Sequence, residues 1–202
     1  MTQEEVLTAF KETGALLEGH FELRSKLHSN RYFQCANVLR YPRVAERLCA
    51  ALVKKMTAAG DLGRIDGVIS PAVGGILVGH EVARALDVKC VFAEKVPGTG
   101  VDASGKSNTV LAMRRFTLTP GERYIVAEDV VTKGGRVQET IDLVRGAGCS
   151  VVAVALLVDR SSGTVRFDDI PMFSLMQMTP ETWTAADCPM CKAGGRPCHP
   201  GS

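Results

Sequence analysis

Residues 124–136 read YIVAEDVVTKGGR, and this stretch decides the fold. Its first four residues are apolar without interruption, which is typical of a strand buried on both faces of a parallel sheet. Two acids, a loop with two glycines and a helical pattern over 137–147 follow. Similar units flank this one, with strands expected at 65–69, 88–92 and 150–158 and helices at 42–59 and 76–86. Such alternation predicts an α/β fold built on a doubly wound, mainly parallel sheet.

The N-terminal segment predicts a helix followed by two strands. Thr2 is a plausible cap for the opening helix, and we expect Leu16 and Leu17 on its apolar side. Residues 19–40 predict a strand, a polar loop and a second strand.

Residues 96–109 are rich in glycine, serine, asparagine and aspartate, which predicts a long loop. A hairpin of residues 110–113 and 115–118 is expected beside it. The whole chain, 1–202, is interpreted as one domain. It has an N-terminal helix and hood to about residue 60, a core sheet over 61–160 and a C-terminal extension over 161–202.

Composition indicates an ordinary globular protein. A net charge of +2 is too small to suggest a nucleic-acid partner. No apolar run approaches the ~18–20 residues that span a bilayer, and the acidic N-terminus does not resemble a signal peptide. The seven cysteines are an odd number, and four are scattered, which favours reduced thiols. We therefore expect a cytoplasmic protein that binds neither nucleic acid nor membrane.

The residues after the 124–127 strand can bind a sugar phosphate. Glu128 and Asp129 are placed to accept hydrogen bonds from a vicinal ribose diol. The backbone of residues 132–135 can curl its N–H groups around a phosphate, at the start of a helix that favours anions. Lys133 and Arg136 add positive charge. The alternative is an acidic loop that only caps the helix; the fixed order of acids, threonine and glycines favours a ribose 5-phosphate site.

Residues 126–136 closely resemble the motif of type I phosphoribosyltransferases that binds phosphoribosyl pyrophosphate (PRPP). The resemblance implies that Asp129 takes part in catalysis and that Mg²⁺ is bound through PRPP, without direct protein ligands. It implies PRPP contacts from the whole motif, namely Glu128, Asp129, Val130, Val131, Thr132, Lys133, Gly134, Gly135 and Arg136. The motif does not by itself select the base.

Three further segments resemble the orotate branch of this family: FELRSKLHSNRYF at 21–33, SPAVGG at 70–75 and VDR at 158–160. By resemblance, Arg24 and Gly74 contact PRPP. The orotate contacts implied are Thr132, Arg160, Tyr32 and Phe33.

Arg160 matters most physically, because orotate carries a carboxylate that a guanidinium binds with two parallel hydrogen bonds. The alternatives are a surface ion pair between Arg160 and Asp159, core packing for Tyr32 and Phe33, a solvated charge at Arg24 and a plain turn at Gly74.

The catalytic loop at 94–108, or the arginines just after it, should contribute a cation to the pyrophosphate. Lys95, Lys106 and Arg115 are the candidates for this catalytic role, and solvated charges are the alternative. The loop from Lys95 to Asn108 is interpreted as a lid that closes over PRPP, with a tolerated surface insertion as the alternative.

Cysteines and a histidine gather near the C-terminus, at Cys188, Cys191, Cys198 and His199. Four such ligands within twelve residues could bind zinc, but Cys198 and His199 are adjacent and cannot easily bend to one ion. We expect free thiols here.

The predicted activity is transfer of ribose 5-phosphate from PRPP to orotate, in a homodimer by resemblance. A purine phosphoribosyltransferase shares the motif but has no use for an arginine aimed at a base carboxylate. A non-catalytic PRPP-binding regulator would carry an added DNA-binding domain. A dinucleotide enzyme is disfavoured because no G-x-G-x-x-G follows a first strand.

Overall fold

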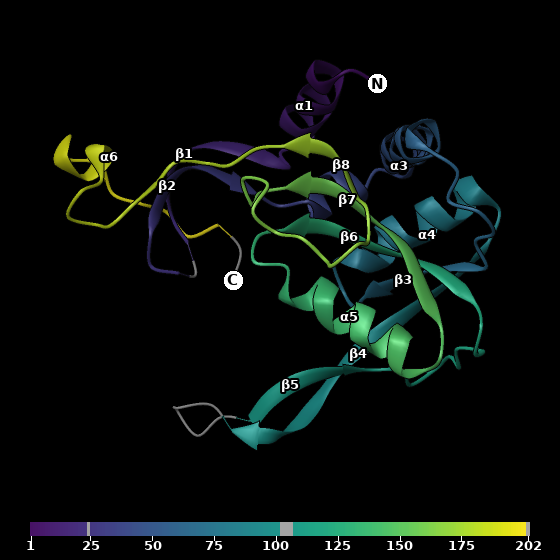
Figure 1. Cartoon of the computed structure of the whole chain (residues 1–202). Coiled ribbons are helices and arrows are strands. Elements are labelled where there is room, and N and C mark those ends of the chain that lie inside the picture. The colour runs from purple at the N-terminus through teal and green to yellow at the C-terminus, as the bar shows by residue number, and fades with distance from the viewer. Residues whose placement is uncertain (24, 102–106, 201–202) are drawn as a thin grey trace.

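The computed structural model describes every residue except 24, 102–106 and 201–202. Its main sheet has six strands in the order β5-β4-β3-β6-β7-β8 (Figure 1). Five of them run parallel, and β5 alone is antiparallel to its neighbour β4. Their bounds are β3 Gly67–Pro71, β4 Lys89–Val101, β5 Ser107–Ala112, β6 Arg123–Val131, β7 Ser150–Asp159 and β8 Met172–Gln177. The mainly parallel sheet is confirmed.

Helices cover both faces of this sheet. On one face lie α1 Gln3–Glu12, α3 Pro42–Ala59 and α4 Gly75–Leu86, which share a buried core with the sheet. On the other face α5 Gly135–Gly146 buries Val137, Ile141 and Val144 against the strands. Two cores on opposite faces explain the uninterrupted apolar runs within β6 and β7, and they confirm the doubly wound arrangement.

A small antiparallel sheet, the hood, stands beside the main sheet. It has the strand order β1-β2-β9, with β1 Leu16–Glu22, β2 His28–Phe33 and β9 Thr182–Trp183. The short helix α2 Ala36–Leu39 leads from it to α3, and α6 Pro189–Lys192 follows β9. In Figure 1 the hood and α6 extend away from the main sheet. The segment after residue 160 thus supplies β8 to the main sheet and β9 to the hood.

The expected opening helix begins correctly but ends earlier than predicted. Thr2 and Glu5 form a reciprocal capping box at its start. The helix stops at Glu12, and Gly14 follows in the left-handed conformation at φ 68°. Leu16 and Leu17 therefore lie in β1 rather than on the helix, because glycine tolerates that conformation and the chain turns there.

The expected loop over 96–109 is wrong in its described parts. β4 continues to Val101 and pairs with β5, with Val96 opposite Val110 and Lys95 opposite Leu111. The expected hairpin of 110–113 with 115–118 does not form. The long β4–β5 hairpin forms because Leu111 is buried and its backbone N–H donates to Glu139 on α5. No local sequence pattern predicts the contact between Leu111 and Glu139.

None of the helices in the described residues has the length and apolar character needed to cross a membrane.

Candidate active site

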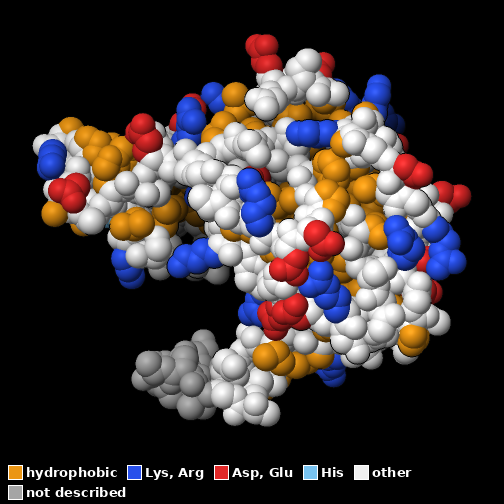
Figure 2. Space-filling model, in the orientation of Figure 1, with side chains coloured by type: hydrophobic (Ala, Val, Ile, Leu, Met, Phe, Trp, Pro, Cys, Tyr) orange, Lys and Arg blue, Asp and Glu red, His pale blue; other side chains and the backbone are white. Residues whose placement is uncertain are grey.

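The candidate site lies where β6 and β7 end and α5 begins. Val131 and Asp159 are register partners in these parallel strands, and the N–H of Arg160 donates to the carbonyl of Val131 at 2.8 Å. A cavity of about 540 Å³ opens here, lined by residues 128–137 together with Thr109 and Glu139. Figure 2 shows this face of the molecule hollowed between the hood and the β4–β5 hairpin. The predicted motif therefore lines one continuous cavity at the carboxyl edge of the sheet.

Glu128 and Asp129 are adjacent acids near the carboxyl end of β6. The N–H of Asp129 donates to Glu128 Oε1 at 3.1 Å, and the N–H of Val130 donates to Asp129 Oδ1 at 2.8 Å. Burial, followed by the charge of Asp129, raises the pKa of Glu128 to about 9; burial also raises the pKa of Asp129. Two carboxylates held this close favour a ligand that brings hydroxyl donors or positive charge.

The loop at Gly74 and Gly75 approaches this acidic pair closely. A side-chain carbon on Gly74 would lie 3.2 Å from Asp129 Oδ2, and one on Gly75 would lie 3.0 Å from Glu128 Oε1. The peptide bond between Ala72 and Val73 is cis. A side chain at either glycine would therefore crowd the acids facing the loop, a contact that the alternative of a plain tight turn does not explain.

Residues 132–136 form the loop that leads into α5 and its first turn, where binding of an anion stays a prediction. Gly134 adopts φ 78° at the N-cap of α5, and a side-chain carbon there would meet Val165 Cγ1 at 2.8 Å. Thr132 and Lys133 are exposed at the cavity. The first turn of α5 has N–H groups without intrahelical acceptors, which favour an anion at this point.

Arg136 holds the hairpin as well as lining the cavity. Its guanidinium pairs with Glu139 at 2.6 Å and donates to Thr109 Oγ1 at 2.9 Å. Glu139 in turn accepts from the N–H of Leu111. Sequence reasoning missed Thr109 and Glu139; the i, i+3 spacing of Arg136 and Glu139 could have indicated the ion pair, but nothing local indicates Thr109.

Arg160 is largely buried beside the hood. Its guanidinium carbon lies 5.4 Å from the centre of the Phe33 ring, and burial lowers the pKa of Arg160. Its Nε atom is buried without a hydrogen-bond partner among the described residues. Asp159 instead accepts from the N–H of Ser161 and from Gln177, so the alternative of a surface ion pair between Arg160 and Asp159 is wrong.

Phe33 and Tyr32 differ in their surroundings. Phe33 is buried and packs edge-on against Phe10, so it belongs to the core as well as lying under Arg160. Tyr32 is half-buried and packs on Phe21. A contact of either ring with orotate stays a prediction.

The candidate loop cations separate into three groups. Lys95 is exposed on β4, and its charge lowers the pKa of Glu128 against the larger effect of burial, so it lies within electrostatic reach of the acids. Arg115 is ion-paired with Glu94. Lys106 and Arg24 lie outside the described residues, as does the tip of the predicted lid.

Comparison with known proteins identifies the family. Residues 37–186 match the family model described as phosphoribosyl transferase domain. The orotate phosphoribosyltransferase of Heliobacterium modesticaldum is 47% identical over 206 residues, covering 100% of this chain and 99% of that protein. That of Acidithiobacillus ferrooxidans is 45% identical over 203 residues, covering 100% of this chain and 98% of the relative.

The chain belongs to the orotate phosphoribosyltransferase family.

Solved structures of this family and its neighbours show the same fold. The orotate phosphoribosyltransferase of Aeropyrum pernix aligns with TM-score 0.67 at 22% identity, covering 86% of this chain and 93% of that one. An adenine phosphoribosyltransferase from Rhodothermus marinus aligns with TM-score 0.63 at 21% identity, covering 85% and 99%. The fold is thus shared across base specificities, and full-length sequence identity is what assigns the chain to the orotate phosphoribosyltransferases.

Proposed function

We propose that this chain transfers ribose 5-phosphate from PRPP to N1 of orotate, giving orotidine 5′-monophosphate and pyrophosphate in pyrimidine biosynthesis. The observation that carries the choice of base is Arg160, a half-buried residue next to the proposed anion cradle, whose guanidinium no described carboxylate neutralises. The full-length relatives named orotate phosphoribosyltransferase support the same reaction.

The geometry supports a specific placement of PRPP. The ribose diol would donate hydrogen bonds to the carboxyl oxygens of Glu128 and Asp129. Burial is the main cause of the raised pKa values of both acids. The 5-phosphate would accept from the N–H groups of residues 132–136. The pyrophosphate would face the loop at Gly74 and Gly75, with Lys95 supplying positive charge from β4.

Magnesium is part of the proposal, and the donors at the site fit it. Oxygen is the donor atom that this ion prefers, and the negative charge of Glu128 and Asp129 favours a divalent cation nearby, since burial, followed by the charge of Asp129, raises the pKa of Glu128. These residues would hold the ion through the ribose hydroxyls, without direct ligation. When bound, Mg²⁺ supplies neutralisation of the pyrophosphate charge.

Orotate would bind between Arg160 and the start of the cradle. The Arg160 guanidinium would pair with the orotate carboxylate, because a largely buried cation without a described carboxylate partner favours an anionic ligand. Thr132 is exposed at the cavity, one residue beyond Val131, whose carbonyl accepts from the N–H of Arg160. This placement brings base and ribose to the same edge of the sheet.

The protein contributes alignment and charge stabilisation. In the reaction the bond from C1 of the ribose to the pyrophosphate oxygen breaks, and its electron pair leaves with the pyrophosphate. A bond from C1 to N1 of orotate forms, and the N1 proton passes to solvent. By family resemblance the ribose passes through an oxocarbenium-like state, in which the ring carries positive charge. Glu128 and Asp129 would stabilise that charge. Lys95 would stabilise the departing pyrophosphate.

An absorbance assay tests the proposal. We expect orotate consumption that requires both PRPP and Mg²⁺, and no conversion of adenine or hypoxanthine under the same conditions. Conversion of a purine without consumption of orotate would assign the purine branch. Tight PRPP binding by calorimetry without turnover of any base would indicate a regulator.

A homodimer and a cytoplasmic location are proposed from the family resemblance. Sedimentation of the purified chain with and without PRPP checks the first, and fractionation of cells checks the second.

A further inference from the structure

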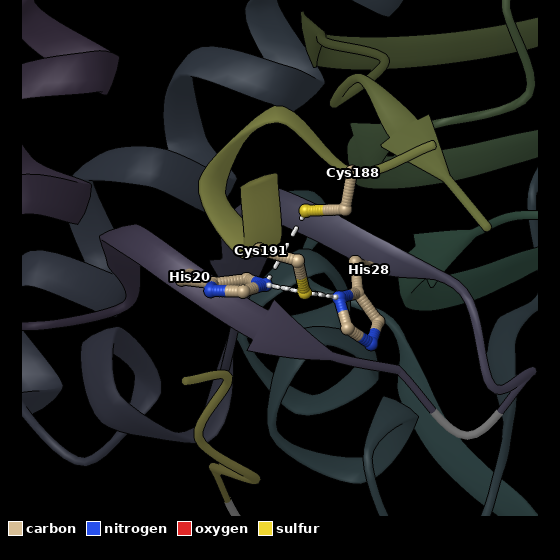
Figure 3. Close-up of side chains that lie close together, drawn as sticks. All are labelled: His20, His28, Cys188 and Cys191. Carbon is tan, nitrogen blue, oxygen red and sulfur yellow. Dashed lines mark hydrogen bonds between the residues drawn. The ribbon is translucent and has the colours of Figure 1, made fainter. Parts of the chain in front are cut away.

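Two histidines and two cysteines from distant parts of the chain meet in the hood. His20, His28, Cys188 and Cys191 each offer a ligand atom, and these atoms all lie within 4.8 Å of one another. Figure 3 shows the two sulfurs and the two imidazole nitrogens pointing toward a common centre. The candidate active site uses none of these side chains.

The hood sheet brings the four residues together. His20 lies on β1, two residues before Glu22, whose register partner on β2 is His28, so both imidazoles project from one face of the hairpin. His28 is also the register partner of Trp183 on β9, and Cys188 follows five residues later. Beyond α6 the chain returns to β1, where the backbone of Cys198 forms an isolated parallel β-bridge with Phe21.

Three nitrogen–sulfur distances in the cluster fit a tetrahedral ion. Zinc lies ~2.3 Å from sulfur and ~2.0–2.1 Å from nitrogen, which puts neighbouring ligand atoms roughly 3.3–3.8 Å apart. His20 Nε2 is 3.3 Å from Cys188 Sγ and 3.6 Å from Cys191 Sγ, and His28 Nδ1 is 3.3 Å from Cys191 Sγ. The two nitrogens are 2.9 Å apart, so they need to move apart by only a few tenths of an ångström to bind the ion.

The surroundings also suit a metal. Cys188 is fully buried and His28 is 5% exposed, so solvent has little access to these two ligands. No carboxylate belongs to the cluster among the described residues. Thiolate and imidazole donors in a four-coordinate set select zinc rather than Mg²⁺ or Ca²⁺, and four protein ligands leave no open position for catalysis.

The cluster differs from the set considered from the sequence. Cys198 is exposed, and His199 Nε2 pairs with Glu22 at 3.2 Å, so neither joins the centre. Their places are taken by His20 and His28, which lie more than 150 residues away in the chain. Only the pairing of β1, β2 and β9 reveals them.

We propose that His20 Nε2, His28 Nδ1, Cys188 Sγ and Cys191 Sγ bind one structural Zn²⁺. The ion fastens the β1–β2 hairpin to the segment after β9. The hood strand β2 carries Tyr32 and Phe33, and Phe33 lies under Arg160. The zinc site therefore holds in place the element that flanks the proposed base pocket, while standing apart from the reacting atoms.

A metal titration of the full chain tests the site. Protein stripped by a chelator under reducing conditions, with the chelator then removed, is titrated with Co²⁺ and afterwards with Zn²⁺. We expect one Co²⁺ per chain, with the intense visible and thiolate charge-transfer absorption of a tetrahedral site, displaced by one equivalent of Zn²⁺. A weak octahedral spectrum, or no saturable binding, overturns the proposal whether or not the enzyme is active.

Matched variants locate the ion. Cys188→Ser and Cys191→Ser should each lose the charge-transfer absorption and the rise in Tm that Zn²⁺ gives the wild type. Cys198→Ser and His199→Ala, which change neighbours outside the cluster, should keep both. Full metal binding in Cys191→Ser, or equal loss in Cys198→Ser, rejects this ligand set. The wild-type titration decides the matter even where a variant fails to fold. A disulfide between Cys188 and Cys191 that survives reduction, shown by mass spectrometry, also rejects it.

Discussion

The guanidinium carbon of Arg160 lies 5.4 Å from the centre of the Phe33 ring. This contact joins the end of β7 to the hood strand β2, two elements that the sequence separates by more than a hundred residues. Burial at this site lowers the pKa of Arg160. A desolvated guanidinium in this setting binds an anionic ligand more strongly than an exposed one does.

Removing this guanidinium should weaken orotate binding selectively. In Arg160→Ala the orotate carboxylate loses its charged partner, at a cost of ~2–4 kcal/mol, which corresponds to roughly 30- to 900-fold in kcat/KM for orotate. The KM for PRPP should change far less. Arg166→Ala, which removes an exposed arginine nearby in sequence, is the control. Equal effects on both substrates would reject a carboxylate-binding role for Arg160.

Removing either acid of the pair should weaken PRPP binding. Asp129→Asn and Glu128→Gln each replace an acceptor of the ribose diol by a group that also donates, with an expected rise of roughly 10- to 100-fold in the KM for PRPP. Asp142→Asn, on the exposed face of α5, is the matched control. The motif assignment fails if both site variants keep wild-type turnover at low PRPP.

The acidic pair should also make stability fall as pH rises. The pKa of Glu128 is about 9 in the folded chain and near 4.5 when unfolded, so the folded state binds more protons between these values. The free energy of unfolding should therefore decrease as pH rises from about 5 to about 9, by roughly 1 kcal/mol or more from this residue.

Urea unfolding of wild type and Glu128→Gln across this pH range measures the effect. The difference between the two free energies should change with pH, because the glutamine has no proton to lose. Parallel pH profiles for the two proteins would show that Glu128 is not perturbed.

Gly134 should not accept a side chain. Gly134→Ala forces a φ of 78° on an alanine and drives its Cβ toward Val165, which should lower stability by ~1–2 kcal/mol and raise the KM for PRPP. Gly146→Ala, at the end of the same helix and with open space around it, provides the comparison. Thermal unfolding of the two variants distinguishes a local strain at residue 134 from a general effect of alanine in α5.

Lys95 should matter more for turnover than Arg115. Lys95 is exposed on β4 within electrostatic reach of the acidic pair, whereas Arg115 is ion-paired with Glu94. We expect Lys95→Ala to lower kcat at least tenfold by removing ~1.4 kcal/mol or more of charge stabilisation on the leaving pyrophosphate. Arg115→Ala should lower kcat only a fewfold. The reverse order in steady-state assays would move the catalytic cation to Arg115.

The sequence by itself predicted a doubly wound, mainly parallel sheet with strands near 65–69, 88–92, 124–127 and 150–158, and a ribose 5-phosphate site after the third of them. The pattern consists of the apolar run at Tyr124 to Ala127, the acids after it and the glycines at 134 and 135. These residues act through contacts within a few positions of one another, so a short window of sequence is enough to recognise them. The helix cap at Thr2 is local in the same way. The family follows from these residues as well, because the cradle is one contiguous stretch of chain.

Only the tertiary structure decided the long-range pairings. The loop expected at 96–109 became the β4–β5 hairpin because Leu111 is buried and bound to Glu139 on α5. The contact between Arg160 and Phe33 joins the segment after β7 to the hood strand β2, while Asp159 accepts from Ser161 and Gln177. His20 and His28 meet Cys188 and Cys191 because three hood strands from opposite ends of the chain pair side by side. Pairing and packing between distant segments set these contacts, and no local pattern in the sequence indicates which segments meet.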